Sequence, residues 1–226
     1  MSCTPDITDR LRERAGRLHD AEVIADILEM PFILAGGAMR SAEPRDYDIF
    51  GFDKPIDLAK VEYRCRGRTD TSFIVRTDNA VTMMRRGQVI QFCKHFKPTA
   101  FALVDSFDFT HIQAGVVFDG DGEIVNFAYT KAFENVELYS DIPTYTGSEY
   151  PLSSLARLVK FEKRGDFGSA DDIHFLAQIL VIFRDIVKRG FTDEDDFESQ
   201  CAAISASFGC VAPEELYELL KKGGAK

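Results

Sequence analysis

The sequence lacks the features of a membrane-spanning, secreted or zinc-binding protein. No apolar run approaches the roughly 18 residues that span a bilayer, and the first residues do not resemble a secretory signal. The five cysteines are odd in number and include no Cys-x-x-Cys pair, so neither a disulfide framework nor a zinc site is expected. The four histidines show no metal-ligand spacing. We therefore expect a cytoplasmic protein with reduced thiols.

The composition is that of an ordinary globular protein. The 226 residues allow one large domain, or one domain with a smaller appendage, and a hydrophobic content of 45% is enough to build a sizeable core. Neither an internal repeat nor a low-complexity segment interrupts the chain.

The charge is unevenly distributed along the chain. The formal net charge is −10, yet residues 60–97 contain nine lysines and arginines against three acidic residues. Such a local excess of positive charge favours a binding site for a polyanion, for example a short RNA or another nucleic-acid end. The alternative is that Arg64, Arg66 and Arg68 belong to a solvated loop or edge strand.

The strongest candidate site begins with a pair of glycines. The apolar run 32–35 ends in Gly36 and Gly37, and Arg40 follows three residues later. Glycine allows a backbone to approach phosphate groups closely, and the N-terminus of a following helix favours their negative charge. A glycine pair alone is more often a simple turn.

Two aspartates separated by one residue follow the glycine pair. In an extended strand Asp46 and Asp48 present their carboxylates on one face, while Tyr47 and Ile49 point the other way into a core. Two carboxylates at this spacing suit Mg²⁺, with Mn²⁺ as the alternative ion. Substrate phosphates typically complete the coordination shell of such an ion. Taken alone, an Asp-x-Asp is more often a solvated strand edge.

Together and in this order, the glycine pair and the Asp-x-Asp indicate a functional site far more specifically than either does alone. The stretch 32–50 resembles the head domain of the DNA polymerase β-type nucleotidyltransferase superfamily. Within it, the class II tRNA CCA-adding enzymes and bacterial poly(A) polymerases are most similar. The resemblance implies transfer of an NMP from an NTP to a hydroxyl acceptor, with release of pyrophosphate. It also implies that Asp46 and Asp48 hold the metals, while Gly36, Gly37 and Arg40 hold the triphosphate. Ser41 stands where the family has an aspartate.

A second segment is similar to the Arg-Arg-Asp-Phe-Thr-x-Asn-Ala motif of the class II enzymes. With one extra residue in this chain after Thr110, residues 108–110 and Ala114 match, whereas Ser106 and Phe107 replace the arginine pair and Gln113 replaces the asparagine. The resemblance implies that Asp108 and Thr110 contact the nucleotide, and the changed residues leave the choice of NTP open. Without the resemblance, this segment would read as the start of a strand with an exposed aspartate.

A metal site of this type commonly takes a third carboxylate from a neighbouring strand. The segment that follows the Asp-x-Asp offers two candidates, Asp105 and Asp108.

The third similarity lies in the amphipathic segment 152–164. It resembles the neck helix that follows the head in those enzymes, and Arg157 and Lys160 lie on one helical face from which they could reach phosphate or base. The alternative is a solvent-facing cationic stripe over an apolar core face. The resemblance extends over residues 32–165. The final helices are too short to be the body and tail that hold tRNA, so activity on tRNA ends is not implied.

We expect an α+β fold, with a nucleotidyltransferase-type mixed sheet flanked by helices and followed by a C-terminal helical bundle. The head would span residues 1–145, with N-terminal helices at 5–29, and the helical domain residues 146–226. Expected strands are 32–35, 46–52, 71–77, 79–84, 89–96, 108–118 and 124–127. Expected helices are 55–61, 98–106, 152–164, 169–189, 192–208 and 213–222, with caps at Thr4, Ser169 and Thr192.

Two other functional classes compete with the enzyme. The first is a non-catalytic module that binds nucleotide or nucleic acid, or a partner subunit on the same fold, which the substitutions at Ser41, Ser106 and Phe107 favour. The second is a toxin-like transferase that modifies RNA or protein. The intact Asp-x-Asp favours the enzyme, because a protein that no longer binds metal has no physical reason to keep two carboxylates on one face.

Overall fold

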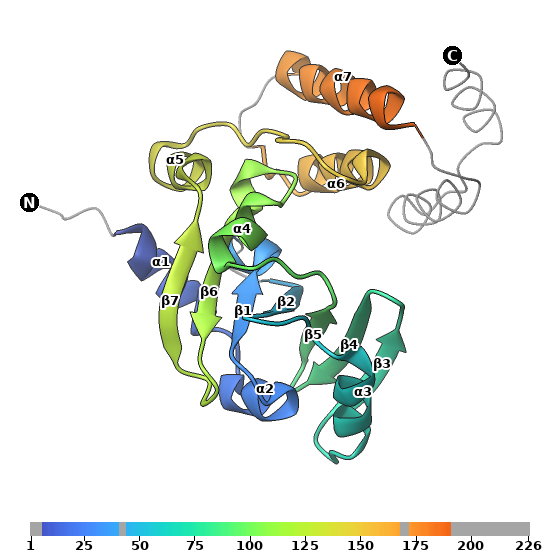
Figure 1. Ribbon diagram of the computed structural model, residues 1–226. Helices are drawn as coiled ribbons and strands as arrows, with labels where there is room; N and C mark the ends of the chain where they lie inside the picture. Colours follow the sequence, from blue (N-terminus) through green and yellow to red (C-terminus); the bar gives the residue numbers. More distant parts are fainter. Residues whose placement is uncertain (1–5, 41–43, 168–171, 191–226) are drawn as a thin grey trace, which may run out of the picture. The chain divides into compact units, whose positions relative to one another are not determined.

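The computed structural model describes residues 6–40, 44–167 and 172–190 (Figure 1). By its internal contacts the chain divides into two units, Met1–Asp141 and Ile142–Lys226. The first unit contains the sheet and the second contains helices, and each is described by itself below.

The first unit is built on a seven-stranded mixed sheet with the order β3-β4-β5-β2-β1-β6-β7 (Figure 1). β2 and β5 pair in parallel, and all other neighbouring strands pair antiparallel. β1 and β2 therefore lie near the middle of the sheet, where both faces can be covered. The strands are Phe32–Ala35 (β1), Asp46–Gly51 (β2), Ser72–Arg76 (β3), Ala80–Arg85 (β4), Gln88–Cys93 (β5), Ala114–Phe118 (β6) and Ile124–Tyr129 (β7).

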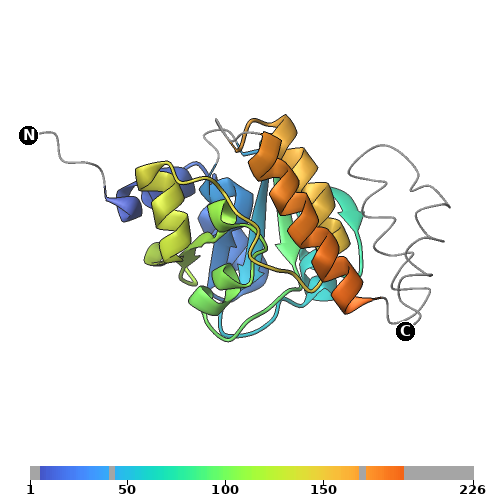
Figure 2. The ribbon, with the colours of Figure 1, turned by 90° about the horizontal axis from the view of Figure 1, so that it is seen from above.

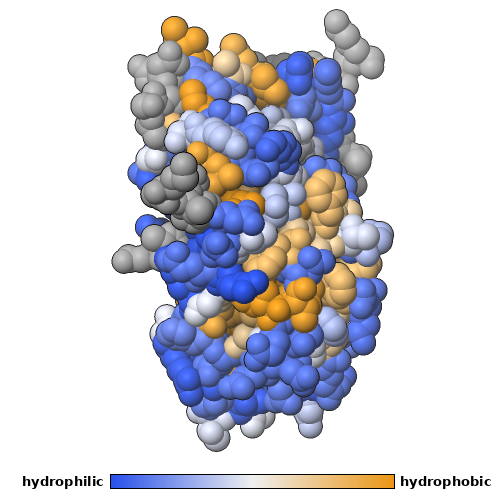
Figure 3. Space-filling model, turned by 90° about the vertical axis from the view of Figure 1, so that its left-hand side faces the viewer, coloured by the Kyte–Doolittle hydropathy of each residue, from blue (hydrophilic) through white to orange (hydrophobic). Residues whose placement is uncertain are grey.

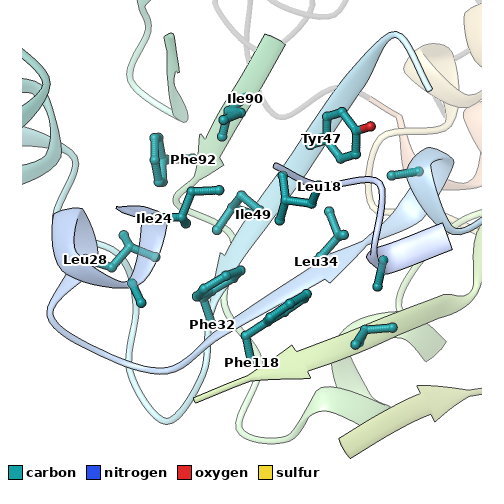
Figure 4. Close-up of a cluster of buried hydrophobic side chains, with 14 of the residues drawn as sticks. Leu18, Ile24, Leu28, Phe32, Leu34, Tyr47, Ile49, Ile90, Phe92 and Phe118 are labelled. Atoms are coloured by element: carbon teal, nitrogen blue, oxygen red, sulfur yellow. The ribbon is translucent and has the colours of Figure 1, made fainter. Parts of the chain in front are cut away.

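Helices cover the two faces of this sheet unequally. On one face α1 (Ile7–Ala15), α2 (Ala21–Leu28) and α3 (Leu58–Arg66) pack against strand side chains in the larger core cluster. Figure 4 shows part of this cluster, with Ile24 and Leu28 of α2 beside the strand residues. The rings of Phe32 and Phe118 stack there with centroids 4.8 Å apart. On the other face the short helix α4 (Ala100–Asp105) covers a smaller cluster.

Alternation along β2 assigns each side chain to one of these faces. Tyr47 and Ile49 belong to the larger cluster, as the sequence predicts, with 4% and 0% of their surface exposed. Phe50 belongs to the smaller cluster beneath α4. Asp46 and Asp48 share the parity of Phe50, so they emerge on the face that α4 covers only in part.

The structure corrects the predicted helix 55–61. The helix begins three residues later, because the Asp57 carboxylate caps it by accepting hydrogen bonds from the backbone N–H groups of Ala59 and Lys60. It continues to Arg66. Arg64 and Arg66 consequently lie on a helix, and the interpretation as a loop or edge strand is wrong for them.

The predicted strand 108–118 is also wrong over its first half. Residues Thr110–Ile112 form a 3-10 turn, η2, and the strand begins only at Ala114. One helix was missed entirely, α5 at Lys131–Tyr139, whose N-cap Thr130 accepts a hydrogen bond from the backbone N–H of Phe133.

The edge strand β7 lies on an apolar side of the first unit. Apolar side chains gather on the surface on the side of β7 and α5 (Figure 3), where 57% of Val125 is exposed. The Asn126 side chain accepts a hydrogen bond from the Phe127 backbone N–H at 2.8 Å. This internal bond occupies a donor on an edge that another strand could otherwise pair with.

The second unit contains two long helices, α6 (Pro151–Lys163) and α7 (Asp172–Arg189), which pack side by side (Figure 2). The predicted helices 192–208 and 213–222, and the caps at Thr4, Ser169 and Thr192, lie outside the described residues. Within the described part of the chain, no helix is both long and apolar enough to cross a membrane.

The β6–β7 hairpin supplies a test of the fold. Gly122 has φ +84°, and a Cβ there would lie 2.4 Å from the backbone nitrogen of Glu22. Gly120, in the same turn, has no neighbour within 4 Å of its Cβ position. We expect Gly122→Ala to lower the free energy of unfolding by roughly 2 kcal/mol or more.

The matched variant Gly120→Ala should change this free energy by less than about 0.5 kcal/mol. Urea unfolding of both variants measures the difference. Equal stability of the two variants would contradict the close approach of the hairpin to the first turn of α2.

Candidate active site

The two aspartates of β2 lie in a row of polar and small side chains that crosses the sheet. Asp46 is exposed and Asp48 is half-buried. In the strand register Asp48 is paired with Gln91 of β5 on one side and with Ala35 of β1 on the other, and Ala35 is paired with Gly115 of β6. The residues beside Asp48 toward β6 are therefore an alanine and a glycine.

Tyr47, between the two aspartates, is held firmly on the opposite face. Its hydroxyl donates a hydrogen bond to the backbone oxygen of Arg17 at 3.1 Å and accepts one from the Gln88 amide at 3.0 Å. Burial raises the pKa of this phenol, so it stays protonated. Because strand side chains alternate, this anchor directs both aspartates to the other face.

Electrostatics at Cys93 show that both carboxylates reach the same neighbourhood. Burial raises the pKa of the Cys93 thiol, and the negative charges of Asp48 and then Asp46 raise it further. Cys93 pairs with Phe50 in the strand register, so its thiol and the two carboxylates lie on the same face of the sheet, the one that α4 partly covers. A thiol in this environment stays protonated and is a poor nucleophile.

The glycine pair lies directly against Asp48. Gly36 and Gly37 begin the 3-10 turn η1 (Gly36–Met39), and Gly36 has φ +77°, which favours glycine. A Cβ on Gly36 would lie 3.6 Å from Oδ2 of Asp48, whereas one on Gly37 would meet nothing within 4 Å. The buried Gly36 therefore lies next to the Asp48 carboxylate, and the exposed Gly37 follows it in the turn.

Arg40 ends η1, and the turn is held from behind by another arginine. The Arg14 guanidinium, from α1, donates to the backbone oxygen of Met39 and forms an ion pair with Glu137 of α5 at 2.7 Å. Arg10 also donates to the backbone oxygen of Glu137, at 2.6 Å. These contacts fix the glycine turn relative to α1 and α5.

The segment around Asp108 packs against the glycine turn. Asp108 and Thr110 are both buried, with 5% and 4% of their surface exposed, and η2 contacts η1. The Phe107 ring lies 4.0 Å from the Cβ position of Gly36 and 5.7 Å from the ring of Phe50. The structure therefore brings together Gly36, Asp48 and the segment that contains Asp108.

Gln113, which stands where the family motif has asparagine, has a structural role here. Its amide donates to the backbone oxygen of Phe107 at 2.8 Å, and its side-chain oxygen accepts a bond from the Thr130 hydroxyl at 2.9 Å. Thr130 caps α5. Gln113 thus links the Asp108 segment to the same helix that holds Arg14, a role that sequence reasoning missed.

His111 is a buried imidazole beside this site. Burial, and next the positive charge of Arg40, lower the pKa of His111 from 6.5 to about 3, so the ring is neutral at physiological pH. The ring also packs edge-on against Phe109, with centroids 5.9 Å apart. The effect of Arg40 shows that its charge reaches η2, and with it the Asp108 segment.

Asp105 is exposed at the end of α4. Arg157 and Lys160 lie on α6 of the second unit. Within residues 6–40, 44–167 and 172–190, no three His, Cys, Asp or Glu side chains gather as a metal-binding group. The described residues thus offer an Asp-x-Asp pair without a third converging ligand.

The arginines of the basic region lie on the opposite side of the sheet from Asp46 and Asp48. α3 packs on the face that holds Tyr47, and a groove of about 630 Å³ runs between α3 and the end of α2. Arg64 donates to the backbone oxygen of Ile27 at 2.9 Å, and Arg68 pairs with Asp26 at 2.7 Å. These two arginines therefore stabilise the packing of α3 and the loop after it against α2.

With this geometry in view, we compared the chain with known proteins. The sequence profile of the Gabija anti-defense 2 (Gad2) family matches residues 9–137, which include the whole sheet, both aspartates and the Asp108 segment. The chain belongs to the Gad2 family. The match ends within α5, so it contains every element that holds the glycine turn. Among curated proteins, none matches the chain.

Solved structures similar to this Gad2 family member include CCA-adding enzymes and a tRNA-processing enzyme. A CCA-adding enzyme in complex with CTP has a TM-score of 0.52 at 17% identity, with 97% of this chain and 53% of that chain covered. The Thermotoga maritima CCA-adding enzyme complexed with tRNA has a TM-score of 0.50 at 17% identity, with 89% and 50% covered.

A tRNA-processing enzyme with CTP has a TM-score of 0.50 at 13% identity, with 89% of this chain and 56% of that chain covered. The chain spans about half the length of these neighbours. At this level of identity the similarity establishes the fold, which is the nucleotidyltransferase fold predicted from the sequence.

The buried imidazole of His111 predicts a pH dependence of stability. The unfolded chain takes up a proton on this ring near pH 6.5, whereas the folded protein does so only near pH 3. The unfolded state thus binds more protons in this window, so the free energy of unfolding falls as the pH decreases from 6.5 towards 3, by up to about 1.4 kcal/mol per pH unit.

We expect His111→Gln to remove this part of the pH dependence, and the matched variant His19→Gln, at an exposed ring, to retain it. Urea unfolding between about pH 7 and pH 4 measures both slopes. If His111→Gln kept the wild-type slope, the imidazole would be accessible to protons in the folded state.

Proposed function

We propose that this protein is a metal-dependent nucleotidyltransferase that transfers an NMP from an NTP to a hydroxyl acceptor and releases pyrophosphate. The observation that carries the proposal is the approach of Gly36 to the Asp48 carboxylate, on the strand face that Asp46 shares. A glycine turn next to two carboxylates on one strand face is an arrangement suited to a metal–triphosphate complex.

The donor set fits Mg²⁺ or Mn²⁺. Asp46 and Asp48 supply two hard carboxylate oxygens from one face, and Mg²⁺ is typically bound by one or two carboxylates together with substrate phosphates. When bound, such ions neutralise phosphate charge and lower the pKa of the attacking hydroxyl. The absence of a third converging ligand among the described residues is compatible with a site that substrate completes.

Each neighbouring residue then has a defined task. The backbone of Gly36 and Gly37 would lie against the triphosphate, and Arg40 would add positive charge at the end of the same turn. Asp108 and Thr110, buried beside the turn, would contact sugar or base. Arg157 and Lys160 are proposed as additional phosphate or base contacts from α6.

The reaction balances without a further reactant. The acceptor hydroxyl loses its proton and its oxygen forms a bond to the α-phosphorus, while the bond from that phosphorus to the bridging oxygen breaks and pyrophosphate leaves. The acceptor would be an RNA end, a small molecule or a protein. The family name supports a role in counteracting Gabija defence, and the neighbours' titles name CTP and tRNA.

A second candidate is a non-catalytic module that binds nucleotide or nucleic acid. Two observations favour it. No three potential ligands converge in the described part of the chain, and Phe107, which stands where the class II motif has arginine, lies against the glycine turn. A short nucleic-acid end bound along residues 60–97 belongs to either candidate.

The test of catalysis uses labelled NTPs, Mg²⁺ or Mn²⁺, and panels of RNA, protein and small-molecule acceptors. We expect Asp46→Asn and Asp48→Asn each to reduce label transfer by at least roughly a hundredfold, because loss of a metal ligand removes several kcal/mol of transition-state stabilisation. Asp78→Asn, in the exposed β3–β4 turn, is the matched control and should retain activity.

Transfer that survives the double substitution of Asp46 and Asp48 would refute the metal assignment. If no acceptor is labelled, yet an NTP raises the melting temperature of the wild-type protein, the binding module is correct and the enzyme is not. Retention of this shift in Asp48→Asn would also place the nucleotide elsewhere.

A second pair of variants tests which acidic residue of the segment 105–108 takes part in the reaction. Asp108 is buried against the glycine turn, while Asp105 is exposed at the end of α4, so we propose Asp108, either as a sugar or base contact or as a ligand. Asp108→Asn should lower label transfer by roughly tenfold or more, and Asp105→Asn should leave it within about twofold of the wild type. The reverse result would move the assignment to Asp105.

A further inference from the structure

The sheet face that carries Asp46 and Asp48 continues beyond them over β5, β4 and β3. In the strand register Asp48 is paired with Gln91 of β5, Gln91 with Thr82 of β4, and Thr82 with Val75 of β3. Because directly paired residues of neighbouring strands lie on the same face, these side chains form one row across the sheet. The row begins at the proposed metal site and ends at the edge strand β3.

A second row runs beside the first and begins at Asp46. Asp46 is paired with Val89 of β5, Val89 with Met84 of β4, and Met84 with Ser72 of β3. The two rows lie on the same face, because residues two apart in a strand point the same way. Beyond the two aspartates, they form a surface that we call the open face: Ser72, Val75, Thr82, Met84, Val89 and Gln91.

The open face is accessible from solvent. Val75 and Met84 are 49% and 42% exposed, and the other members of the open face are exposed or half-buried. By contrast Val81 and Met83, the alternate residues of β4, are fully buried on the opposite face. The helix on the side of the aspartates, α4, packs on β6 and β7 at the other end of the sheet (Figure 1).

The charged side chains of these three strands lie on the opposite face. β3, β4 and β5 contain two charged residues, Arg76 and Arg85. Arg76 forms an ion pair with Glu62 of α3, which packs on the opposite face. Arg85 is 5% exposed and forms an ion pair with Asp20 at 2.9 Å. The open face is therefore built from uncharged side chains.

This distribution of charge indicates which acceptor the open face suits. RNA and DNA are held by cationic side chains that neutralise phosphates, and single strands also stack on aromatic rings. The six residues of the open face include neither kind, and they adjoin two carboxylates that repel phosphate. Exposed valine and methionine instead suit a polypeptide, whose backbone is neutral and whose apolar side chains gain free energy when they are buried.

The extent of the open face also favours a polypeptide over a small molecule. Neighbouring strands lie about 4.8 Å apart, so the row from Asp48 to Val75 spans roughly 14 Å. Small molecules are mostly bound in concave pockets, whereas this surface is the face of a sheet. The Gln91 amide donates to the Thr82 hydroxyl at 3.4 Å, and both side chains are of the kind that donates and accepts hydrogen bonds with peptide groups.

We propose that the open face is the acceptor site of the transferase, and that it binds a segment of protein whose serine, threonine or tyrosine hydroxyl lies beside Asp46 and Asp48. The inference rests on the proposed function. The hydroxyl oxygen forms a bond to the α-phosphorus and its proton passes to water. The bond from that phosphorus to the bridging oxygen breaks, and its electron pair leaves with pyrophosphate. The product is a protein that carries an NMP in phosphodiester linkage.

Label transfer identifies the class of acceptor. The full-length protein is incubated with NTPs labelled at the α-phosphate, Mg²⁺ or Mn²⁺, and an unfractionated bacterial extract, with Asp48→Asn as the background. We expect label in material that protease degrades and ribonuclease does not. Label in RNA or in small molecules would overturn the inference and leave the transferase in place. Label in no fraction would refute the transferase itself, and the acceptor site with it.

Val75→Lys and Met84→Lys test whether the open face holds the labelled protein. Each should lower protein labelling by roughly fivefold or more, because it replaces an apolar contact with a charge that binding would desolvate. The rise in melting temperature on addition of NTP should be unchanged. Asn79→Lys, in the exposed β3–β4 turn, is the matched control and should be labelled as the wild type is.

Unchanged labelling with both lysine variants would place the acceptor elsewhere and overturn the inference. Loss of labelling together with the NTP-dependent rise in melting temperature would assign the effect to the nucleotide site, against a separate acceptor face.

A photoreactive side chain tests the contact directly. On irradiation, p-benzoylphenylalanine in place of Val75 should capture proteins that carry transferred label, and the same group in place of Asn79 should not. Equal capture from the two positions, or capture of unlabelled proteins alone, would contradict binding of the acceptor on the open face.

Discussion

The candidate site depends on the strict alternation of side chains along β2. Tyr47 is anchored by hydrogen bonds to Arg17 and Gln88, and Ile49 is fully buried in the larger core cluster. These contacts leave no freedom of register, because a slip of one residue would exchange the two faces and bury both aspartates. The hydrophobic core thus determines where Asp46 and Asp48 point, at the centre of a sheet whose neighbouring positions toward β6 are alanine and glycine.

The sequence predicted this part of the structure because the signals are local. An apolar run, a glycine pair and an Asp-x-Asp all lie within residues 32–50, and the pairing of β1 with β2 follows from their short connection. The fold class is confirmed by the mixed sheet and by the similarity to nucleotidyltransferases. The roles of individual residues in metal and nucleotide binding remain predictions.

What the sequence could not predict depends on contacts between distant segments. The segment from Asp108 reads as a strand from its β-branched and aromatic residues, yet Gln113 bonds to Phe107 and Thr130 and turns it into η2. Arg64 reads as part of an exposed basic patch, but it donates to the backbone oxygens of Asp26 and Ile27 in the last turn of α2. In both cases a side chain satisfies a backbone group elsewhere in the fold, and no periodicity within a segment reveals such a partner.

The Arg14–Glu137 ion pair has a consequence for the order of folding. Its partners are 123 residues apart, and Arg14 also donates to the backbone oxygen of Met39 at the end of the glycine turn. Closing a loop of this length costs entropy that must be recovered by contacts formed late, so high contact order slows this step. During synthesis the two aspartates emerge early, but Arg14, which holds the turn beside them, gains its ion-pair partner only after α5 has left the ribosome. A nascent chain shorter than about residue 137 therefore contains both aspartates without this ion pair.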